Sequence, residues 1–295
     1  THAIRFGSTI NNWIRDTTFA VSGNTCILDQ VDRAVCVMFA TQLHTSHAVV
    51  AGNTLNASAQ FAHGVDVGAN VQNSSVAVVG NTMDIHGVLE YGFYLYGLLR
   101  ASSNVTVAGN EIEMRLYSPG CSFRFGMVRC DTYTFGVANG GSRQDGAVAD
   151  DHSTYAVLGN TVRLETLEAV SEGNIGYGIW AKYSAGRNSV VRFDGNSVVA
   201  ARSDKYYRLQ RAFSATIAGA HASGAYSITN NTLSVYAIGT QVGIIVWAGS
   251  YTDADLRAPV VVSGNTVSAA TPTPEGQCVE CVARGVQVHG TNSVI

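Results

Sequence analysis

Acidic side chains are the groups in this sequence best suited to acid–base or metal chemistry, and they are most concentrated in one short segment. Asp145, Asp150 and Asp151 lie in a Gly-flanked stretch beside Arg143 and His152. Carboxylate oxygens suit Ca²⁺, so a calcium site at the three aspartates is one interpretation. A solvated polar loop without a metal is the other, and the composition of the segment favours it.

Enzymes that cleave polysaccharides need clustered carboxylates, often with Arg or Lys, on one face of the fold. Asp66 is the acidic residue to consider, because the repeat described below aligns it on an outward face between Cys36 and Tyr94. That column offers no paired carboxylate. We therefore expect a protein that is not an enzyme.

Six cysteines form three pairs that are close in the sequence: Cys26 with Cys36, Cys121 with Cys130, and Cys278 with Cys281. An even number of cysteines in local pairs is typical of an oxidising compartment, so we predict three disulfides. Six free thiols are the alternative. The Cys-x-x-Cys at 278–281 has no second copy, which argues against a zinc site.

Four Asn-x-Ser/Thr sequons, at Asn56, Asn73, Asn104 and Asn230, are candidate N-glycosylation sites. Asn73 and Asn104 are the first candidates, because each precedes a predicted strand at what the alignment makes an equivalent corner. Asn56 falls in an outward polar column and comes next. Asn230 lies at a bend where a glycan would be hindered. Use of these sites requires a eukaryotic secretory route.

The composition excludes several classes of protein. Charged residues make up 13% of the 295 residues and hydrophobic residues 46%, which is too apolar for a disordered chain. A net charge of −3 without any Lys/Arg run excludes a basic nucleic-acid surface. No apolar stretch reaches the roughly 18 residues of a membrane-spanning helix.

One bend, Gly-Asn followed mostly by Thr, recurs along the whole sequence and must position these groups. Its Asn occurs eight times, preceded by Gly except in the seventh copy: Asn24, Asn53, Asn81, Asn110, Asn160, Asn196, Asn231 and Asn265. The third residue before each Asn is apolar: Val21, Val50, Val78, Val107, Val157, Phe193, Ile228 and Val262. Alternating apolar residues on both sides of the bend predict two short strands with one buried face.

A third strand precedes each pair and has the pattern small, apolar, any, apolar. Clear copies begin at Gly64, Gly92, Gly178, Gly243 and Gly285, and weaker copies at Ala3, Ala34 and Ala212. Between 121 and 139 the copy begins at either Gly126 or Gly136.

Three short strands per repeat, with no helical stretch, predict an all-β fold. We expect a right-handed parallel β-helix (solenoid) of about eight coils, with a Gly-Asn-Thr ladder at the bend. Residues 1–295 would form one domain, with loops near 118–130 and 140–153.

The outward positions of the third strand carry more aromatic residues than a solvated face needs. Tyr94, Tyr96, Trp180 and Trp247 fall there. Aromatic side chains exposed on a rigid scaffold stack against sugars or contact a partner protein. The alternative is that loops such as 118–130 fold over them and complete a second small core.

These residues resemble two families. At the level of the fold, the whole chain resembles the right-handed parallel β-helix superfamily of pectate-lyase-like proteins. More narrowly, 75–83 (SVAVVGNTM) and 104–110 (NVTVAGN) resemble repeats of the large dispersed-gene-family surface proteins of trypanosomatids. The narrower resemblance implies a secreted or membrane-displayed glycoprotein with an adhesive role, and it supplies no catalytic residues.

Together these features predict an extracellular or cell-surface glycosylated module with a structural or adhesive role. Neither end of the chain has an evident polar cap, so we expect a segment of a longer repeat protein or a filament of copies stacked end to end. The expected partners are other copies or neighbouring repeats, glycans, and host or surface proteins. The alternatives are a polysaccharide lyase, a glycoside hydrolase or a carbohydrate-binding module. Apart from the calcium option, we expect no cofactor.

Overall fold

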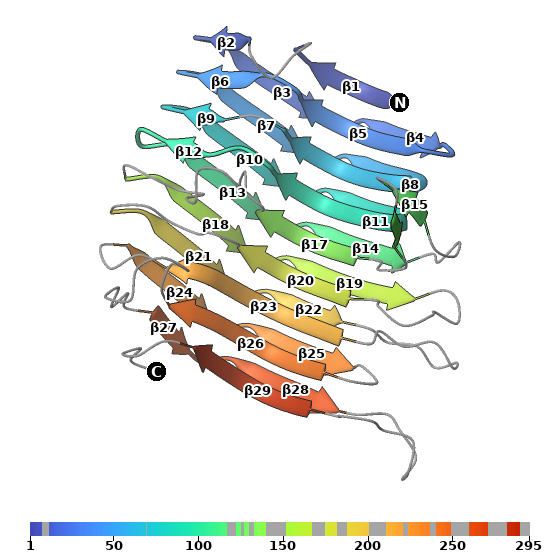
Figure 1. The fold of residues 1–295 in the computed structure, drawn as a ribbon. Helices are drawn as coiled ribbons and strands as arrows, with labels where there is room; N and C mark the ends of the chain where they lie inside the picture. The colour runs from blue at the N-terminus through green and yellow to red at the C-terminus, as the bar shows by residue number, and fades with distance from the viewer. Residues whose placement is uncertain are drawn as a thin grey trace.

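The computed structural model describes residues 1–7, 12–68, 70–116, 122–124, 127–129, 133–139, 152–166, 175–181, 188–200, 211–220, 224–236, 240–248, 260–270 and 282–289. This part of the chain forms β-strands and contains no helix. Nearly all strand pairs are parallel, and the termini lie at opposite ends of the stack (Figure 1). The fold is therefore all-β and built from repeats, as a parallel solenoid is.

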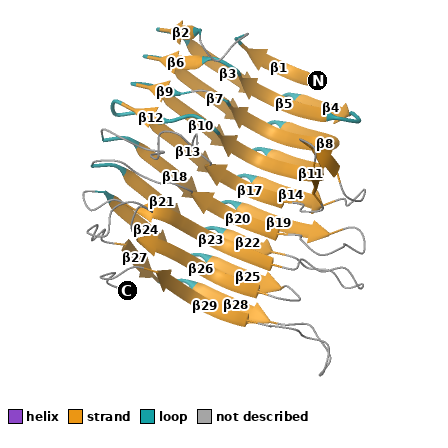
Figure 2. Cartoon of the chain, viewed as in Figure 1, coloured by secondary structure: helices purple, strands orange, loops and turns teal. Residues whose placement is uncertain are grey.

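Two large parallel sheets and one small one run the length of the stack or part of it (Figure 2). The eight-stranded sheet contains β3 (Thr18–Ser22), β7 (His47–Ala51), β10 (Ser75–Val79), β13 (Asn104–Ala108), β18 (Thr154–Leu158), β21 (Val190–Asp194), β24 (Ala225–Thr229) and β27 (Val260–Ser263). The fifteen-stranded sheet contains β1 (His2–Phe6), β4 (Thr25–Asp29), β5 (Arg33–Phe39), β8 (Thr54–Val67), β11 (Thr82–Leu95), β14 (Glu111–Leu116), β17 (Tyr133–Asn139), β19 (Thr161–Thr166), β20 (Ile175–Ala181), β22 (Ser197–Ala200), β23 (Arg211–Ala220), β25 (Thr232–Tyr236), β26 (Thr240–Ala248), β28 (Thr266–Ala270) and β29 (Val282–His289).

The small sheet adds a short fourth strand to the first repeats, which the sequence pattern did not predict. It contains β2 (Trp13–Arg15), β6 (Gln42–His44), β9 (Val71–Gln72) and β12 (Leu99–Arg100). Each of its last three strands buries one apolar side chain: Leu43, Val71 and Leu99. Two or three residues are too few to establish a period, so the pattern was not visible in the sequence.

Register follows the repeat, so each residue pairs with its counterpart one repeat later. Val50 pairs with Val78, Val78 with Val107, and Val107 with Val157. All four are fully buried, as predicted for the column before the bend. Stacking identical apolar positions at the spacing of about 4.8 Å between strands yields one continuous core.

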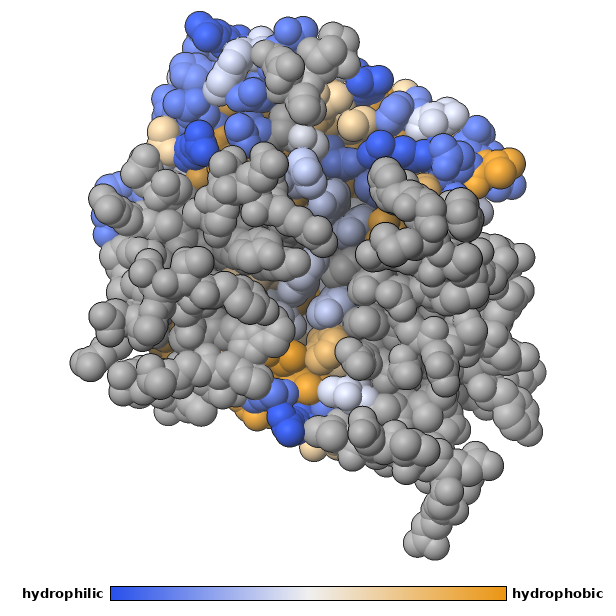
Figure 3. Space-filling model, viewed as in Figure 1, coloured by the Kyte–Doolittle hydropathy of each residue, from blue (hydrophilic) through white to orange (hydrophobic). Residues whose placement is uncertain are grey.

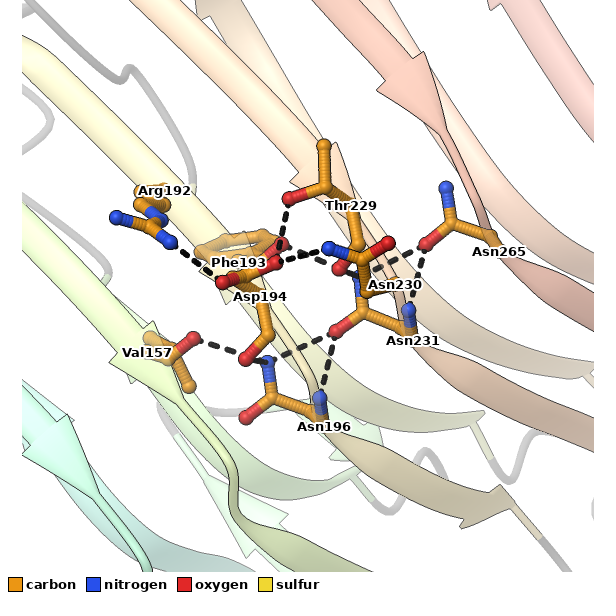
Figure 4. Close-up of polar contacts among 9 residues, drawn as sticks. All are labelled: Val157, Arg192, Phe193, Asp194, Asn196, Thr229, Asn230, Asn231 and Asn265. Atoms are coloured by element: carbon orange, nitrogen blue, oxygen red, sulfur yellow. Dashed lines mark hydrogen bonds and ion pairs between the residues drawn. The ribbon is translucent and has the colours of Figure 1, made fainter.

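The bend asparagines form a hydrogen-bonded ladder through the stack. The Oδ1 atom of Asn81 accepts the backbone N–H and the Nδ2 group of Asn53, at 3.0 and 2.9 Å. The same pattern joins Asn196 to Asn231 and Asn231 to Asn265 (Figure 4). Gly80 before Asn81 has a φ of +61°, a conformation that glycine adopts at little cost. In the seventh copy Asn230 takes that place with a φ of +56°.

A second polar ladder lies at another corner and was not expected from the sequence. The Oγ atom of Ser74 accepts the backbone N–H of Ser46, and the Oγ atom of Ser103 accepts that of Ser74, at 2.9 and 3.2 Å. Ser153 continues the series by accepting the N–H of Ser103. Each hydroxyl satisfies a buried donor at a corner where strands cannot pair.

The third strand is placed as predicted at Gly64, Gly92, Gly178, Gly243 and Gly285, and the ambiguous copy begins at Gly136. Two weaker copies are shifted by two residues. Val37 pairs with Val65, and Ala215 with Ile179, so these copies begin at Cys36 and Ser214 instead of Ala34 and Ala212. A shift of two keeps the alternation of a strand unchanged, which is why the pattern alone could not fix it.

The small residue that opens the third strand points into the core. A Cβ atom on Gly136 would lie 2.2 Å from a methyl carbon of Val162, and one on Gly178 would lie 2.2 Å from Val198. Cys36 occupies this inward column in the first layers and forms a disulfide with Cys26. The predicted Cys26–Cys36 disulfide is therefore present, and the outward placement of Cys36 was wrong.

Loop predictions fall mostly outside the described residues. Within 118–130, β15 (Ser122–Arg124) and β16 (Met127–Arg129) pair as antiparallel strands. The segment 140–153 is described only at its last two residues. Cys121, Cys130, Cys278 and Cys281 lie outside the described residues, so their two disulfides stay predictions.

Candidate functional site

The outer face of the third strands gathers the aromatic residues that the sequence pointed to. Asp66 of β8 pairs with Tyr94 of β11, and Trp180 of β20 lies two strands further along, beyond Ala138 of β17. On its other side Asp66 pairs with Met38, and not with Cys36 as predicted. The difference is the two-residue shift of β5.

A second column on this face adds rings that the sequence reasoning missed. Tyr91 stacks on Tyr94 with centroids 4.2 Å apart, and Tyr177 stacks on Trp180 at 5.2 Å and on Phe213 at 4.9 Å. The turn at the small inward residue brings positions three apart to the same side. Strict alternation would have placed Tyr91 and Tyr177 on opposite faces from Tyr94 and Trp180.

We call this surface the aromatic face. It consists of Tyr91, Tyr94, Tyr96, Tyr177, Trp180 and Phe213. Residues of intermediate to high hydropathy form a strip down the middle of the molecule in the space-filling view (Figure 3). Tyr96 is 48% exposed, whereas Tyr91 is only 9% exposed. The side chain of Trp247 lies outside the described residues.

Burial changes the acidity of the tyrosines on this face. It raises the pKa of Tyr91 and of Tyr94 well above the ordinary value, with smaller contributions from the neighbouring phenol groups and from Asp66. Both phenols are therefore protonated at neutral pH. They can donate a hydrogen bond but cannot serve as bases there.

A charged cluster adjoins the aromatic face at its N-terminal end. The Oδ2 atom of Asp66 accepts hydrogen bonds from Arg33 Nη2 at 3.1 Å and from His63 Nδ1 at 3.0 Å. The side chains of Asp66 and His63 are buried, and that of Arg33 is 42% exposed. The His63 ring meets Tyr91 edge-on at 5.0 Å. The carboxylate thus fixes both the guanidinium and the imidazole beside the rings.

A second ionic group lies on the outer side of β11 and β14, and the sequence reasoning passed over it. Asp84 and Glu113 are register partners, and Arg115 lies 3.7 Å from Asp84 Oδ2 and 2.9 Å from Glu113 Oε1. His86 Nε2 lies 2.8 Å from Asp84 Oδ1. All four side chains are about one-third exposed. The period-two polar column containing Asp84 and Glu113 was the available signal.

The sequons lie at different kinds of position. Asn73 and Asn104 are both exposed, but they are not equivalent, because Asn104 pairs with Ser75. Asn56 is half-buried. Asn230 is exposed at the bend, and its Nδ2 donates to Asp194 Oδ1 at 3.0 Å (Figure 4).

Metal binding has limited support in the described part of the chain. No group of three or more His, Cys, Asp or Glu side chains there is arranged to hold an ion. The calcium prediction concerns Asp145, Asp150 and Asp151, which lie outside the described residues. Among the residues that the structure describes, no helix is long and apolar enough to cross a membrane.

Comparisons with known proteins give no assignment. No family model, no curated protein and no solved structure matches this chain.

Proposed function

We propose that this chain is a right-handed parallel β-helix of about eight coils that acts as an extracellular structural and adhesive module. The aromatic face is its binding surface, and glycans are the ligands that such a surface suits. The observation that carries the proposal is Tyr96, an exposed ring contiguous with Tyr94 on a scaffold locked by two polar ladders. The resemblance to trypanosomatid surface proteins and the use of the four sequons belong to the same proposal.

A rigid aromatic surface favours binding for a physical reason. The rings are held by packing, so little conformational entropy is lost when a ligand stacks on them. Tyr96 lies 6.0 Å from Tyr94, between ring centroids, which offers neighbouring apolar surfaces with polar hydroxyl tips. Sugars present matching C–H faces and hydroxyl groups.

The test is a glycan array probed with the complete chain and two variants. We expect wild-type binding to a defined set of glycans and a loss of about tenfold or more in Tyr96→Ala, since stacked aromatics are worth about 1–3 kcal/mol. Trp13→Ala is the control, because Trp13 is 39% exposed but lies on the small sheet. Equal binding by Tyr96→Ala would remove the aromatic face from the proposal.

End-to-end assembly with other copies is part of this proposal, and the polarity of the Asn ladder supports it. Among the described residues, Asn24 Oδ1 accepts no hydrogen bond, and the backbone N–H of Asn265 donates none. These two open groups are complementary. Sedimentation at rising concentration should reveal association that Asn24→Arg weakens, whereas a monomer at every concentration would remove assembly from the proposal.

A polysaccharide-cleaving enzyme is the second candidate, favoured by Asp84 and Glu113 alone. Register partners lie about 4.8 Å apart along the stack, which resembles the carboxylate spacing of about 5–5.5 Å in retaining glycosidases. Arg115 binds both carboxylates, however. It would stabilise both as anions, whereas glycosidases need one carboxyl that can give up a proton.

A further inference from the structure

The charged cluster presents a guanidinium whose position is fixed but whose donors are not all used. Arg33 Nη2 donates to Asp66 Oδ2, and this is the only hydrogen bond of the Arg33 side chain within the described residues. Asp66 is held from a second direction by His63 Nδ1. A guanidinium has five N–H donors in a planar fork. Arg33 therefore keeps donors for a further acceptor.

Two buried atoms of the cluster lack hydrogen-bond partners in the described part of the chain. They are Arg33 Nε, a donor, and Asp66 Oδ1, an acceptor. Unpaired buried polar atoms are unfavourable and uncommon in folded proteins. A hydroxyl group both donates and accepts, so a sugar hydroxyl or an ordered water could complete the two. The cluster has the polar half of a saccharide site.

Aromatic rings supply the apolar half at the correct place. Asp66 and Tyr94 are register partners, one strand spacing apart. The ring of Tyr94 lies 5.9 Å from that of His63 and 6.0 Å from that of Tyr96. A ligand held by Arg33 can therefore extend over Tyr94 toward the exposed Tyr96 ring.

The local charge indicates the sign of the ligand. Arg5 and Arg33 contribute +2 and Asp66 contributes −1, which gives +1 on this face, although the whole chain carries −3. The pKa of His2 is lowered, first by burial and then by the N-terminal ammonium, Arg5 and Arg33. A positive site next to aromatic rings suits an anionic sugar and not a cationic one.

We propose that Arg33, Tyr94 and Tyr96 bind a saccharide that carries a carboxylate. Arg33 donates to the carboxylate, the two tyrosines stack on the sugar rings, and Asp66 and His63 are positioning residues that hold Arg33 in place. The inference rests on the proposed glycan-binding function and names its ligand class.

The experiment uses an array of matched glycans that differ only in the acid group: sialyllactose with lactose, and glucuronate-terminated with glucose-terminated oligosaccharides. The complete chain is compared with Arg33→Gln and with Arg163→Gln. Arg163 is the matched control, because it is similarly exposed and ion-paired, to Glu111, but lies on β19 away from this face. Thermal unfolding of each variant verifies that it is folded.

We expect the wild type to bind acidic glycans about 10- to 100-fold more tightly than their neutral partners, since a hydrogen bond to a charged group is of that strength. Arg33→Gln should abolish the preference, Arg163→Gln should retain it, and Arg33→Lys should restore it in part, because lysine keeps the charge but loses the fork. The preference should also weaken as salt rises.

Two other outcomes overturn the inference in distinguishable ways. If neutral and acidic partners bind equally, or if Arg33→Gln keeps the preference, the acidic-sugar site is wrong, although a Tyr96-dependent glycan function survives. If no glycan on the array binds, the proposed function fails together with the inference. Should Arg33→Gln unfold, Arg33→Lys alone decides, and an undiminished preference in that variant contradicts the bidentate role of Arg33.

Discussion

At the scale of single residues, the polar side chains inside this protein act mainly by satisfying the backbone. Asn81 shows how dense the bonding is. Its Nδ2 donates to the carbonyl oxygens of Val50 and Val79 and to Asn110 Oδ1, while its own Oδ1 serves Asn53. A buried amide with every lone pair and proton used leaves no capacity for a ligand. This places ligand chemistry on the outer face.

Replacing Asn81 with alanine should destabilise the protein by about 2–4 kcal/mol, because it leaves buried backbone groups of Val50 and Asn53 unpaired. Asn24→Ala is the matched control. Asn24 is exposed and bonds only to Ser22 and Asn53, so it should cost about 1 kcal/mol or less. Denaturant unfolding of both variants measures the difference, and equal losses would contradict the ladder.

The buried tyrosines predict the behaviour of the protein at high pH. Burial raises the pKa of Tyr91, Tyr94 and Tyr155 above the ordinary value. A pKa that is higher in the folded state means that the unfolded chain loses the proton first. Stability from these groups is thus complete below about pH 10 and is lost as pH rises from there through the folded pKa.

Ultraviolet titration of tyrosinate can verify this. Of the 13 tyrosines, these three should ionise only with the loss of far-ultraviolet circular dichroism. Ionisation of all 13 in one transition near pH 10, with the fold intact, would contradict their burial.

At the scale of strands, the sequence predicted most of the two main sheets but not all of their details. The bend asparagines and the apolar columns beside them are periodic, so the pairing of Val78 with Val107 followed directly. Tyr91 could not be predicted on the aromatic face, because it depends on the backbone turn beside the inward Gly92. Arg33 reaches Asp66 from another repeat, a contact that no local pattern encodes.

The glycine column offers a matched test of this packing. Gly178→Ala should cost about 1–3 kcal/mol through overpacking, because its Cβ would lie 2.2 Å from a Val198 methyl carbon. Gly285→Ala in the same column should be neutral or slightly stabilising, since no atom lies within 4 Å of the new Cβ. Thermal unfolding compares them. A tolerated Gly178→Ala would place the third strand wrongly.

At the scale of the whole molecule, a core and two ladders on the inside leave the outside free to vary. The central claim is that this outside binds glycans without cleaving them. The competing account depends on Asp84 and Glu113, which share Arg115. Only a measurement that follows the same ligand for both binding and cleavage separates the two.

The most direct test incubates the complete chain with glycans that it retains on the array and analyses them by mass spectrometry. We predict that the bound glycan is recovered intact, with no new reducing ends and no unsaturated products, and that retention is lost in Tyr96→Ala. Glu113→Gln should behave as the wild type does. Reproducible cleavage that disappears in Glu113→Gln or Asp84→Asn would contradict this account and make the protein an enzyme.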